Sequence, residues 1–172
     1  MTTVRQRGRS FQSSEDDLAR VAQRCREAAL RYLAYRPRSA AEVRARLARQ
    51  GYPPETIEAT LGWLEQYALV DDRAFAEFWV ESRQQGRPSS QRLIRAELLQ
   101  RGVPGELART AVDGVDDEES AYRAAARRAV KLSREDEAVF RRRLGAFLER
   151  RGFDYDVIAR TVERIWRETP VS

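Results

Sequence analysis

Apolar residues recur three or four positions apart along most of this chain, which is the spacing that puts them on one face of an α-helix. Val43 and Leu47 lie four residues apart with arginines between them, and Phe140, Leu144 and Leu148 continue the same spacing in a later segment. No segment alternates apolar and polar residues with the two-residue period of a half-buried β-strand. The pattern therefore predicts a protein that is all helix.

Prolines, glycines and capping residues divide this pattern into separate helices. Pro37 ends a first helix that begins near Glu15, because proline does not fit the interior of a helix. Ser39 and Glu42 have the spacing of a capping box, in which each side chain accepts a hydrogen bond from the backbone N–H of the other residue. Gly51 ends the helix that this box begins, because glycine adopts the left-handed conformation at little cost.

The chain contains one phrase three times: a leucine, three variable residues, a glycine and then an apolar residue. The repeated glycines are Gly51, Gly102 and Gly152, at intervals of 51 and 50 residues. A repeat of about fifty residues is one supersecondary unit that buries its apolar face against its neighbours. We therefore predict an elongated tandem array of three three-helix modules, each similar to a helix-turn-helix unit. The modules cover residues 15–72, 73–115 and 116–172, and residues 1–14 are expected to form a flexible basic arm.

Missing residue types exclude several kinds of chemistry. The 172 residues include no histidine and a single cysteine, Cys25, which excludes catalysis by histidine, the usual zinc sites and internal disulfides. Lys131 is the only lysine and does not follow a glycine, so a phosphate-binding P-loop is excluded too. We predict no catalytic residues, no metal site and no cofactor. An enzyme would have to use carboxylates alone, and it is the least favoured of the possible functions.

Neither a membrane span nor a secretory signal is expected. The chain has no run of about 20 apolar residues, the length that crosses a bilayer. The segment from Met1 to Ser14 carries arginines but has no apolar core of the kind that a signal peptide needs. The expected location is the cytoplasm.

Two features have both a structural and a functional interpretation. The pair Asp71-Asp72 could hold a metal ion, but without other convergent ligands it is better explained as the acidic cap of the next helix. The rings of Phe75, Phe78 and Trp79 could stack on the bases of a single strand. At helical spacing, however, such rings are more typical of a core.

Arginine is the dominant charged residue, and it is concentrated in two runs. The chain has 32 basic residues, all but Lys131 arginine, against 27 acidic ones, for a net charge of +5. The first run consists of Arg83, Arg87, Arg92, Arg95 and Arg101, and the second of Arg141, Arg142, Arg143, Arg150 and Arg151. If the modules stack in register, the middle helices lie side by side, and these arginines merge into one stripe that attracts a polyanion. Solvated helix faces paired with nearby acids are the alternative, and charge alone does not separate the two.

Several phrases of the sequence are similar to those of a known family. They are Tyr35-Arg36-Pro37-Arg38-Ser39, Leu69-Val70-Asp71-Asp72, Trp79-Val80-Glu81-Ser82-Arg83 and Arg151-Gly152-Phe153-Asp154-Tyr155. From Ala28 to Glu168 the chain resembles bacterial RecX, the regulatory protein of the RecA recombinase. The resemblance implies tandem three-helix units and a regulator without catalytic residues, acting in DNA repair, recombination and the SOS response.

This resemblance implies that the protein binds the RecA filament on single-stranded DNA. Bound there, it would damp strand exchange, ATP hydrolysis and coprotease action. In this hypothesis the protein is a monomer and the two arginine runs contact the filament and the DNA phosphates. The alternative is a stand-alone DNA-binding or architectural protein that uses helix-turn-helix-like modules without RecA.

Overall fold

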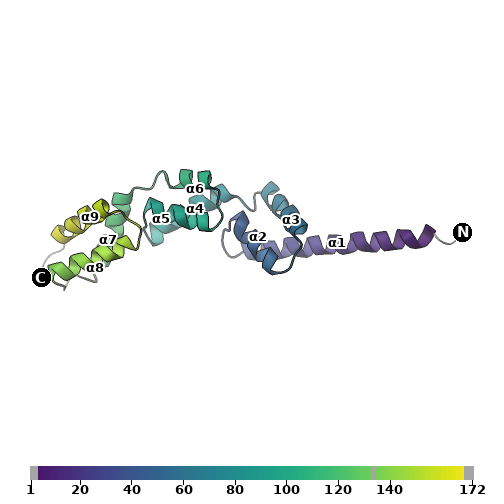
Figure 1. The fold of residues 1–172 in the computed structure, drawn as a ribbon, viewed down its shortest axis with the longest axis horizontal. Helices are drawn as coiled ribbons and strands as arrows, with labels where there is room; N and C mark the ends of the chain where they lie inside the picture. The colour runs from purple at the N-terminus through teal and green to yellow at the C-terminus, as the bar shows by residue number, and fades with distance from the viewer. Residues whose placement is uncertain (1–3, 133–134, 169–172) are drawn as a thin grey trace. The chain divides into compact units, whose positions relative to one another are not determined.

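Nine α-helices make up the computed structural model over the residues that it describes, 4–132 and 135–168, and none of these residues forms a strand (Figure 1). The helices are α1 (Val4–Leu33), α2 (Ala40–Arg49), α3 (Pro54–Gln66), α4 (Asp72–Gly86), α5 (Gln91–Gln100), α6 (Gly105–Val112), α7 (Asp117–Ala129), α8 (Glu137–Glu149) and α9 (Tyr155–Glu168). They form three successive sets of three. The prediction of an all-α protein built from three three-helix modules is therefore confirmed.

The repeated phrase is a helix stop of one defined geometry. Gly51, Gly102 and Gly152 have φ angles of 82°, 76° and 84°, all in the left-handed region. The residue after each glycine donates its N–H to the carbonyl of the repeated leucine, at 3.4, 3.1 and 3.4 Å. Each glycine donates its own N–H to the residue after that leucine. Together these bonds define the Schellman motif, which satisfies carbonyls at the end of a helix.

The predicted start of the second helix is also confirmed. Ser39 Oγ accepts the backbone N–H of Glu42 at 3.1 Å, and the Glu42 carboxylate accepts the backbone N–H of Ser39 at 3.3 Å. These two bonds form the capping box that the spacing indicates. Ser90 occupies the equivalent place before α5 and accepts the N–H of Leu93 at 3.1 Å. The start of each of these two helices is thus fixed by its own serine.

The first helix is longer than the hydrophobic pattern of the sequence predicts. It begins at Val4 rather than near Glu15, so most of the segment expected to be a flexible arm is helical, while residues 1–3 lie outside the described part. The added segment contains no proline, and its one glycine, Gly8, costs a helix only about 1 kcal/mol. Hydrophobic periodicity reports which residues are buried. It does not report where a helix starts, and for this reason it misplaces the boundary.

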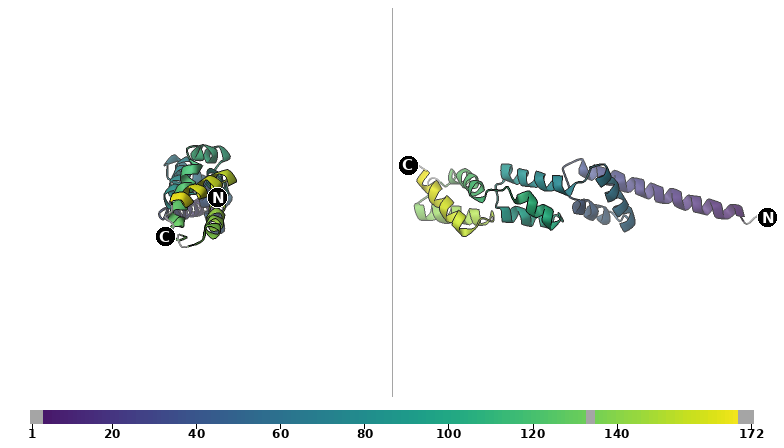
Figure 2. Two further views of the ribbon diagram at one scale, coloured as in Figure 1. Left: turned by 90° about the vertical axis from the view of Figure 1, so that its left-hand side faces the viewer. Right: turned by 90° about the horizontal axis from the view of Figure 1, so that it is seen from above.

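The chain divides into two compact units, residues 1–75 and 76–172. In the N-terminal unit, α2 and α3 pack on the C-terminal part of α1, and the rest of α1 projects beyond them (Figures 1 and 2). The buried core of this unit consists of Cys25, Ala28, Ala29, Val43, Leu47, Ile57, Leu61, Leu64 and Val70. Leu18, close to the predicted start of the first helix near Glu15, is 66% exposed and lies outside this core.

The C-terminal unit contains the second and third modules. In the third module, α7, α8 and α9 pack around Phe140, Leu144 and Leu148, which are fully buried. In the second module, α5 and α6 pack together over Ile94 and Leu98. Phe140, Leu144 and Leu148 have the helical spacing seen in the sequence, and Leu98 is the leucine of the second repeated phrase, so the sequence locates both cores.

An aspartate pair lies at each of two module boundaries. The first aspartate of each pair caps the helix that follows, and the second accepts a backbone N–H from the start of an earlier helix. Asp71 caps α4 by accepting backbone N–H groups of its first turn at 2.8 and 3.1 Å. Asp72 instead accepts the N–H of Ala40, the first residue of α2, at 2.8 Å. Asp116 and Asp117 repeat this division: Asp116 caps α7, and Asp117 accepts the N–H of the first residue of α5 at 2.7 Å. The capping interpretation of Asp71 is confirmed, and the role of its neighbour is new.

Candidate nucleic-acid interface

Two arginines of the first run belong to a closed cluster between α4 and α5. The guanidinium carbons of Arg83 and Arg101 lie 4.4 and 3.8 Å from the ring centroid of Trp79. Glu97 accepts hydrogen bonds from the Trp79 indole N–H at 2.9 Å and from Arg83 Nε at 2.6 Å. Trp79 is therefore engaged by arginines of the same module. These contacts favour a structural role for both arginines.

The other arginines of the first run are exposed. Arg92 donates to the carbonyl of Gly152 at 2.9 Å and lies 3.8 Å from the Asp154 carboxylate. Arg87 and Arg95 have no carboxylate within 4.0 Å among the residues that the structure describes. Their charges are available to a partner.

The second run divides in the same way. Arg141 lies between two acids, 2.7 Å from both Glu137 and Glu163, and Arg143 pairs with Glu135. The hydrogen bonds that Arg141 donates to Glu163 and Glu137 raise the pKa of Arg141 above its usual value. For these arginines the solvated, ion-paired helix face is the better explanation.

Arg142 and Arg150 are exposed, and within the described ranges neither has a carboxylate partner. Like Arg87 and Arg95, these two residues of the second run carry charges that no described carboxylate pairs. Ion pairs account for part of each run and leave the remainder exposed.

The two runs meet end to end, and this corrects the expected arrangement. Ser90, at the start of α5, donates its backbone N–H to the Arg151 carbonyl at 3.0 Å, and the Arg151 side chain donates to the Pro88 carbonyl at 2.9 Å. These bonds put the C-terminal end of α8 against the N-terminal end of α5. The expectation that the flanks of the two middle helices lie side by side is wrong, because the contact is made by a helix stop and a helix cap.

Positive charge is concentrated at this joint. Burial lowers the pKa of Arg151, and the nearby charges of Arg87 and Arg83 lower it further. The Arg151 guanidinium carbon also lies 4.7 Å from the ring centroid of Phe147. The joint therefore brings the arginine runs together at one point.

A surface hollow of about 180 Å³ lies beside the joint. Four cationic side chains line it, Arg127, Arg128, Lys131 and Arg151, and among the described residues its lining contains no acid. The sequence pattern does not single out the first three, because bases at the end of a helix are explained by the helix dipole. Only the fold brings the end of α7 next to Arg151. No signal in the linear sequence would have found this hollow.

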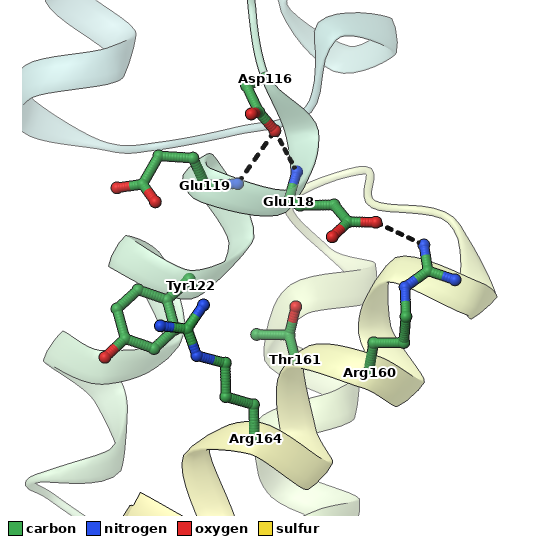
Figure 3. A pocket seen from close by; sticks show the side chains of 7 residues that line it. All are labelled: Asp116, Glu118, Glu119, Tyr122, Arg160, Thr161 and Arg164. Atoms are coloured by element: carbon green, nitrogen blue, oxygen red, sulfur yellow. Dashed lines mark hydrogen bonds and ion pairs between the residues drawn. The ribbon is translucent and has the colours of Figure 1, made fainter.

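A second hollow, between α7 and α9, has mixed charge (Figure 3). Its lining residues are Asp116, Glu118, Glu119, Tyr122, Arg160, Thr161 and Arg164. Glu118 accepts a hydrogen bond from Arg160 at 2.7 Å, and the Arg164 guanidinium lies 3.9 Å from the Tyr122 ring centroid. No group of three metal-ligating side chains occurs in the part of the chain that the structure describes. This hollow is explained by ion pairs that hold α7 and α9 together.

Comparison with known proteins gives the family. Three family models match in order: the first three-helix domain of RecX at residues 25–64, the second at 71–112 and the third at 116–162. The regulatory protein RecX of Chlorobium limicola is 36% identical over 142 residues, which cover 83% of this chain and 89% of that protein. The chain belongs to the RecX family.

Another RecX relative and two solved structures agree with this assignment. The regulatory protein RecX of Thermobifida fusca is 40% identical over 81% of this chain and 77% of its own length. The crystal structure of RecX from Lactobacillus salivarius superposes with a TM-score of 0.71 at 23% identity, covering 85% of this chain and 97% of that one. A second crystal structure of regulatory protein RecX gives a TM-score of 0.74 at 23% identity, covering 90% and 77%. At this identity the two structures show a shared fold.

RecX proteins are regulators and not enzymes, which agrees with the expectation of no catalytic residue. Within residues 4–132 and 135–168 of this RecX chain, no helix combines the length and the apolar character that a membrane span needs. The candidate site of this RecX chain therefore offers exposed guanidinium groups and no catalytic group.

Proposed function

We propose that this chain binds the RecA filament on single-stranded DNA and damps its strand exchange, ATP hydrolysis and coprotease action. Membership of the RecX family, with all three modules in order, is the observation that carries this proposal. The chain would act as a monomer in the cytoplasm and needs no cofactor. A regulator of this kind requires a contact surface rather than a reaction centre.

The exposed arginines without carboxylate partners are our candidates for contact with the filament and its DNA. They are Arg87, Arg95, Arg142 and Arg150. Arg92, which lies 3.8 Å from Asp154, and the half-buried Arg151 are added because they lie at the joint. Guanidinium groups on phosphates supply affinity and position without reading sequence, which suits a filament formed on any strand. Arg83, Arg101, Arg141 and Arg143 are better assigned to the fold, because they contact Trp79 or acids.

The proposal is tested by the ATPase activity of RecA on single-stranded DNA, measured with increasing amounts of the full chain. We expect the wild type to inhibit it and the variant Arg95→Gln/Arg142→Gln to need severalfold more protein for the same inhibition. Arg109→Gln/Arg160→Gln is the matched control, because it removes two charges that acids already pair. If the wild type leaves the ATPase unchanged, the proposed function fails. If the wild type inhibits the ATPase and the test and control variants inhibit it equally well, the unpaired arginines take no part in the inhibition.

Binding to bare DNA without RecA is the second candidate, supported by the resemblance of each module to a helix-turn-helix unit. A pull-down separates the two candidates. The chain is mixed with RecA alone, with single-stranded DNA alone, and with both together in the presence of a nonhydrolysable nucleotide. Preference for the complete filament supports the RecA regulator, and equal binding to bare strands supports the stand-alone protein.

A further inference from the structure

We propose that the hollow beside α4, α7 and α8 is a binding site for a phosphate group of a nucleic-acid backbone, held by Arg127, Arg128, Lys131 and Arg151. The site rests on the proposed function, because it names one place where the single strand of the filament would touch the protein. It adds three residues that lie outside both arginine runs.

The charges in this hollow are uncompensated, unlike most others in the same unit. Arginines within 4.0 Å of a carboxylate elsewhere in the unit are Arg83, Arg92, Arg109, Arg123, Arg141, Arg143, Arg160, Arg164 and Arg167. In the hollow, Arg127 donates to the Gln85 carbonyl at 3.2 Å and Arg151 to the Pro88 carbonyl at 2.9 Å. Neutral carbonyls fix the direction of a guanidinium group but do not cancel its charge. Each group also keeps further N–H donors for a ligand.

One donor in the hollow is buried and unused. Arg128 Nε is inaccessible to solvent and has no hydrogen-bond partner among the described residues. The guanidinium carbons of Arg128 and Arg151 lie 5.8 and 4.7 Å from the Phe147 ring centroid, so they are at most 10.5 Å apart, the sum of the two distances. An unpaired buried donor is uncommon, because it has lost its water without gaining a partner. Rotation of the Arg128 side chain toward the hollow would let an anion there accept this hydrogen bond.

The helix dipoles alone do not account for these cations. The lining residues Gly86, Lys131 and Arg151 place the hollow beside the C-terminal ends of α4, α7 and α8. Each helix end carries roughly half a negative charge. Three such ends offset fewer than two of the four positive charges, so the hollow remains positive and favours an anion.

The surroundings of the hollow suit a chain of phosphates rather than a single small anion. Arg87 directly follows the lining residue Gly86, and its positive charge lowers the pKa of Arg151. Arg150 and Arg151 close the second arginine run at the same place. Positive charge therefore continues from the hollow to the start of α5 and the end of α8. An extended polyanion can use all of these positions at once, and single-stranded nucleic acid has that form.

Salt-dependent binding of a fluorescent oligothymidylate to the full chain tests the site. We expect Arg127→Gln/Lys131→Gln to bind on the order of tenfold more weakly at low salt, with a slope of log K against log salt that is shallower by about 0.7 for each phosphate that the variant no longer neutralises. Arg109→Gln/Arg160→Gln carries the same change of net charge and should bind like the wild type. Both side chains of the test variant are exposed, and Lys131→Gln alone should show part of the effect. Equal slopes for the test and control variants would overturn the site.

The source of the phosphate is distinguished by nuclear magnetic resonance of the Arg128 Nε–H group, assigned with Arg128→Lys. The site for a nucleic-acid backbone is supported if micromolar oligothymidylate saturates the change in chemical shift while inorganic phosphate needs millimolar concentrations to do so. Saturation by micromolar inorganic phosphate would assign the hollow to a free anion, and saturation by polyglutamate alone would assign it to an acidic peptide. Either result overturns the proposal.

The same variants keep this proposal separate from the proposed function. If the wild type inhibits RecA while oligothymidylate binding does not depend on Arg127 and Lys131, the phosphate site fails and the RecA regulator stands. If oligothymidylate binding depends on these residues while the wild type leaves RecA unaffected, the site stands and the proposed function fails.

Discussion

The first and last of the repeated glycine turns have the same backbone geometry but different surroundings. Gly51 and Gly152 each end a helix with φ angles of 82° and 84°. A methyl group built on Gly51 meets no described atom of its unit within 4 Å. On Gly152 the same group would lie 2.7 Å from Leu93 Cβ and 2.6 Å from Ser90 Oγ. Gly51 is needed for the turn alone, whereas Gly152 is needed for the turn and for the approach of another helix.

The difference separates what the residues next to each glycine determine, the turn, from what distant residues determine, the close approach of a helix. The left-handed conformation follows from the leucine, the glycine and the apolar residue that form one Schellman motif. The close approach depends on α5, about sixty residues earlier in the chain. A repeat in the sequence therefore identifies the turn three times but does not say which copy is also a joint.

The largest expected effect is that of Gly152→Ala. The left-handed conformation costs an alanine about 1–2 kcal/mol. The added methyl group also overlaps Leu93 Cβ, which lies next to the backbone and cannot rotate away, and such overpacking costs about 1–3 kcal/mol. We expect the unfolding free energy of the C-terminal unit to fall by about 3 kcal/mol, measured by urea denaturation with hydrogen exchange of the α5 and α8 amides.

Gly62→Ala is the control for this substitution. Gly62 lies inside α3 with ordinary helical geometry, and beyond its own helix backbone no described atom of its unit lies within 4 Å of an added methyl group. Alanine there should be neutral or stabilising. A loss at Gly152 no larger than the loss at Gly51 would mean that the approach of α5 adds nothing, and the comparison of the two turns would fail.

Gly51→Ala should have an intermediate effect. Only the left-handed conformation is penalised, so we expect a loss of about 1 kcal/mol, confined to the N-terminal unit. Hydrogen exchange should accelerate for α2 and α3 and stay unchanged for α8. Accelerated exchange in the C-terminal unit would show that this turn also serves a contact beyond its own unit.

The sequence predicts the local features of this fold because each depends on a few neighbouring residues. The capping box of Ser39 and Glu42, the glycine stops and the cap at Asp71 are all visible as short phrases. The start of α1 at Val4 is not, because no stop signal and no burial pattern marks it. Element type and core positions can therefore be predicted more reliably than the first boundary.

The candidate site is harder to predict, because charge is neutralised in three dimensions. The pairing of Arg141 with Glu137 has helical spacing, but its contact with Glu163 requires α9. The basic hollow combines the end of α7 with Arg151 after α8, and no phrase joins them. A count of arginines along the chain identifies two regions of interest. It does not separate structural arginines from available ones.

Substitutions of the residues that precede Gly152 and Gly51 test the same comparison, with a smaller expected effect on stability. Arg151 precedes Gly152 and donates to the Pro88 carbonyl at 2.9 Å, whereas Gln50 precedes Gly51 and is exposed. Arg151→Ala removes a hydrogen bond and a contact with Phe147, but it also relieves repulsion from Arg87 and Arg83. We expect a net loss of about 0.5 kcal/mol in urea denaturation. Gln50→Ala should change nothing measurable, and an equal loss at both positions would contradict a special joint at Gly152.

The smallest expected effect is the pH dependence of Asp117, which accepts the N–H of Gln91 at the start of the helix that meets Gly152. Burial raises the pKa of the Asp117 carboxyl, although the hydrogen bond from Gln91 opposes this shift. A carboxyl with a raised native pKa favours folding while protonated, and this contribution is lost as pH rises from the unfolded pKa of about 3.9 through the native pKa.

An asparagine at the same position would be neutral throughout and caps about as well. Asp117→Asn should therefore gain stability relative to the wild type between low and neutral pH, by a few tenths of a kcal/mol in urea midpoints. The opposite trend would mean that the bond to Gln91 outweighs burial, and the start of α5 would then be held by an ionised carboxylate.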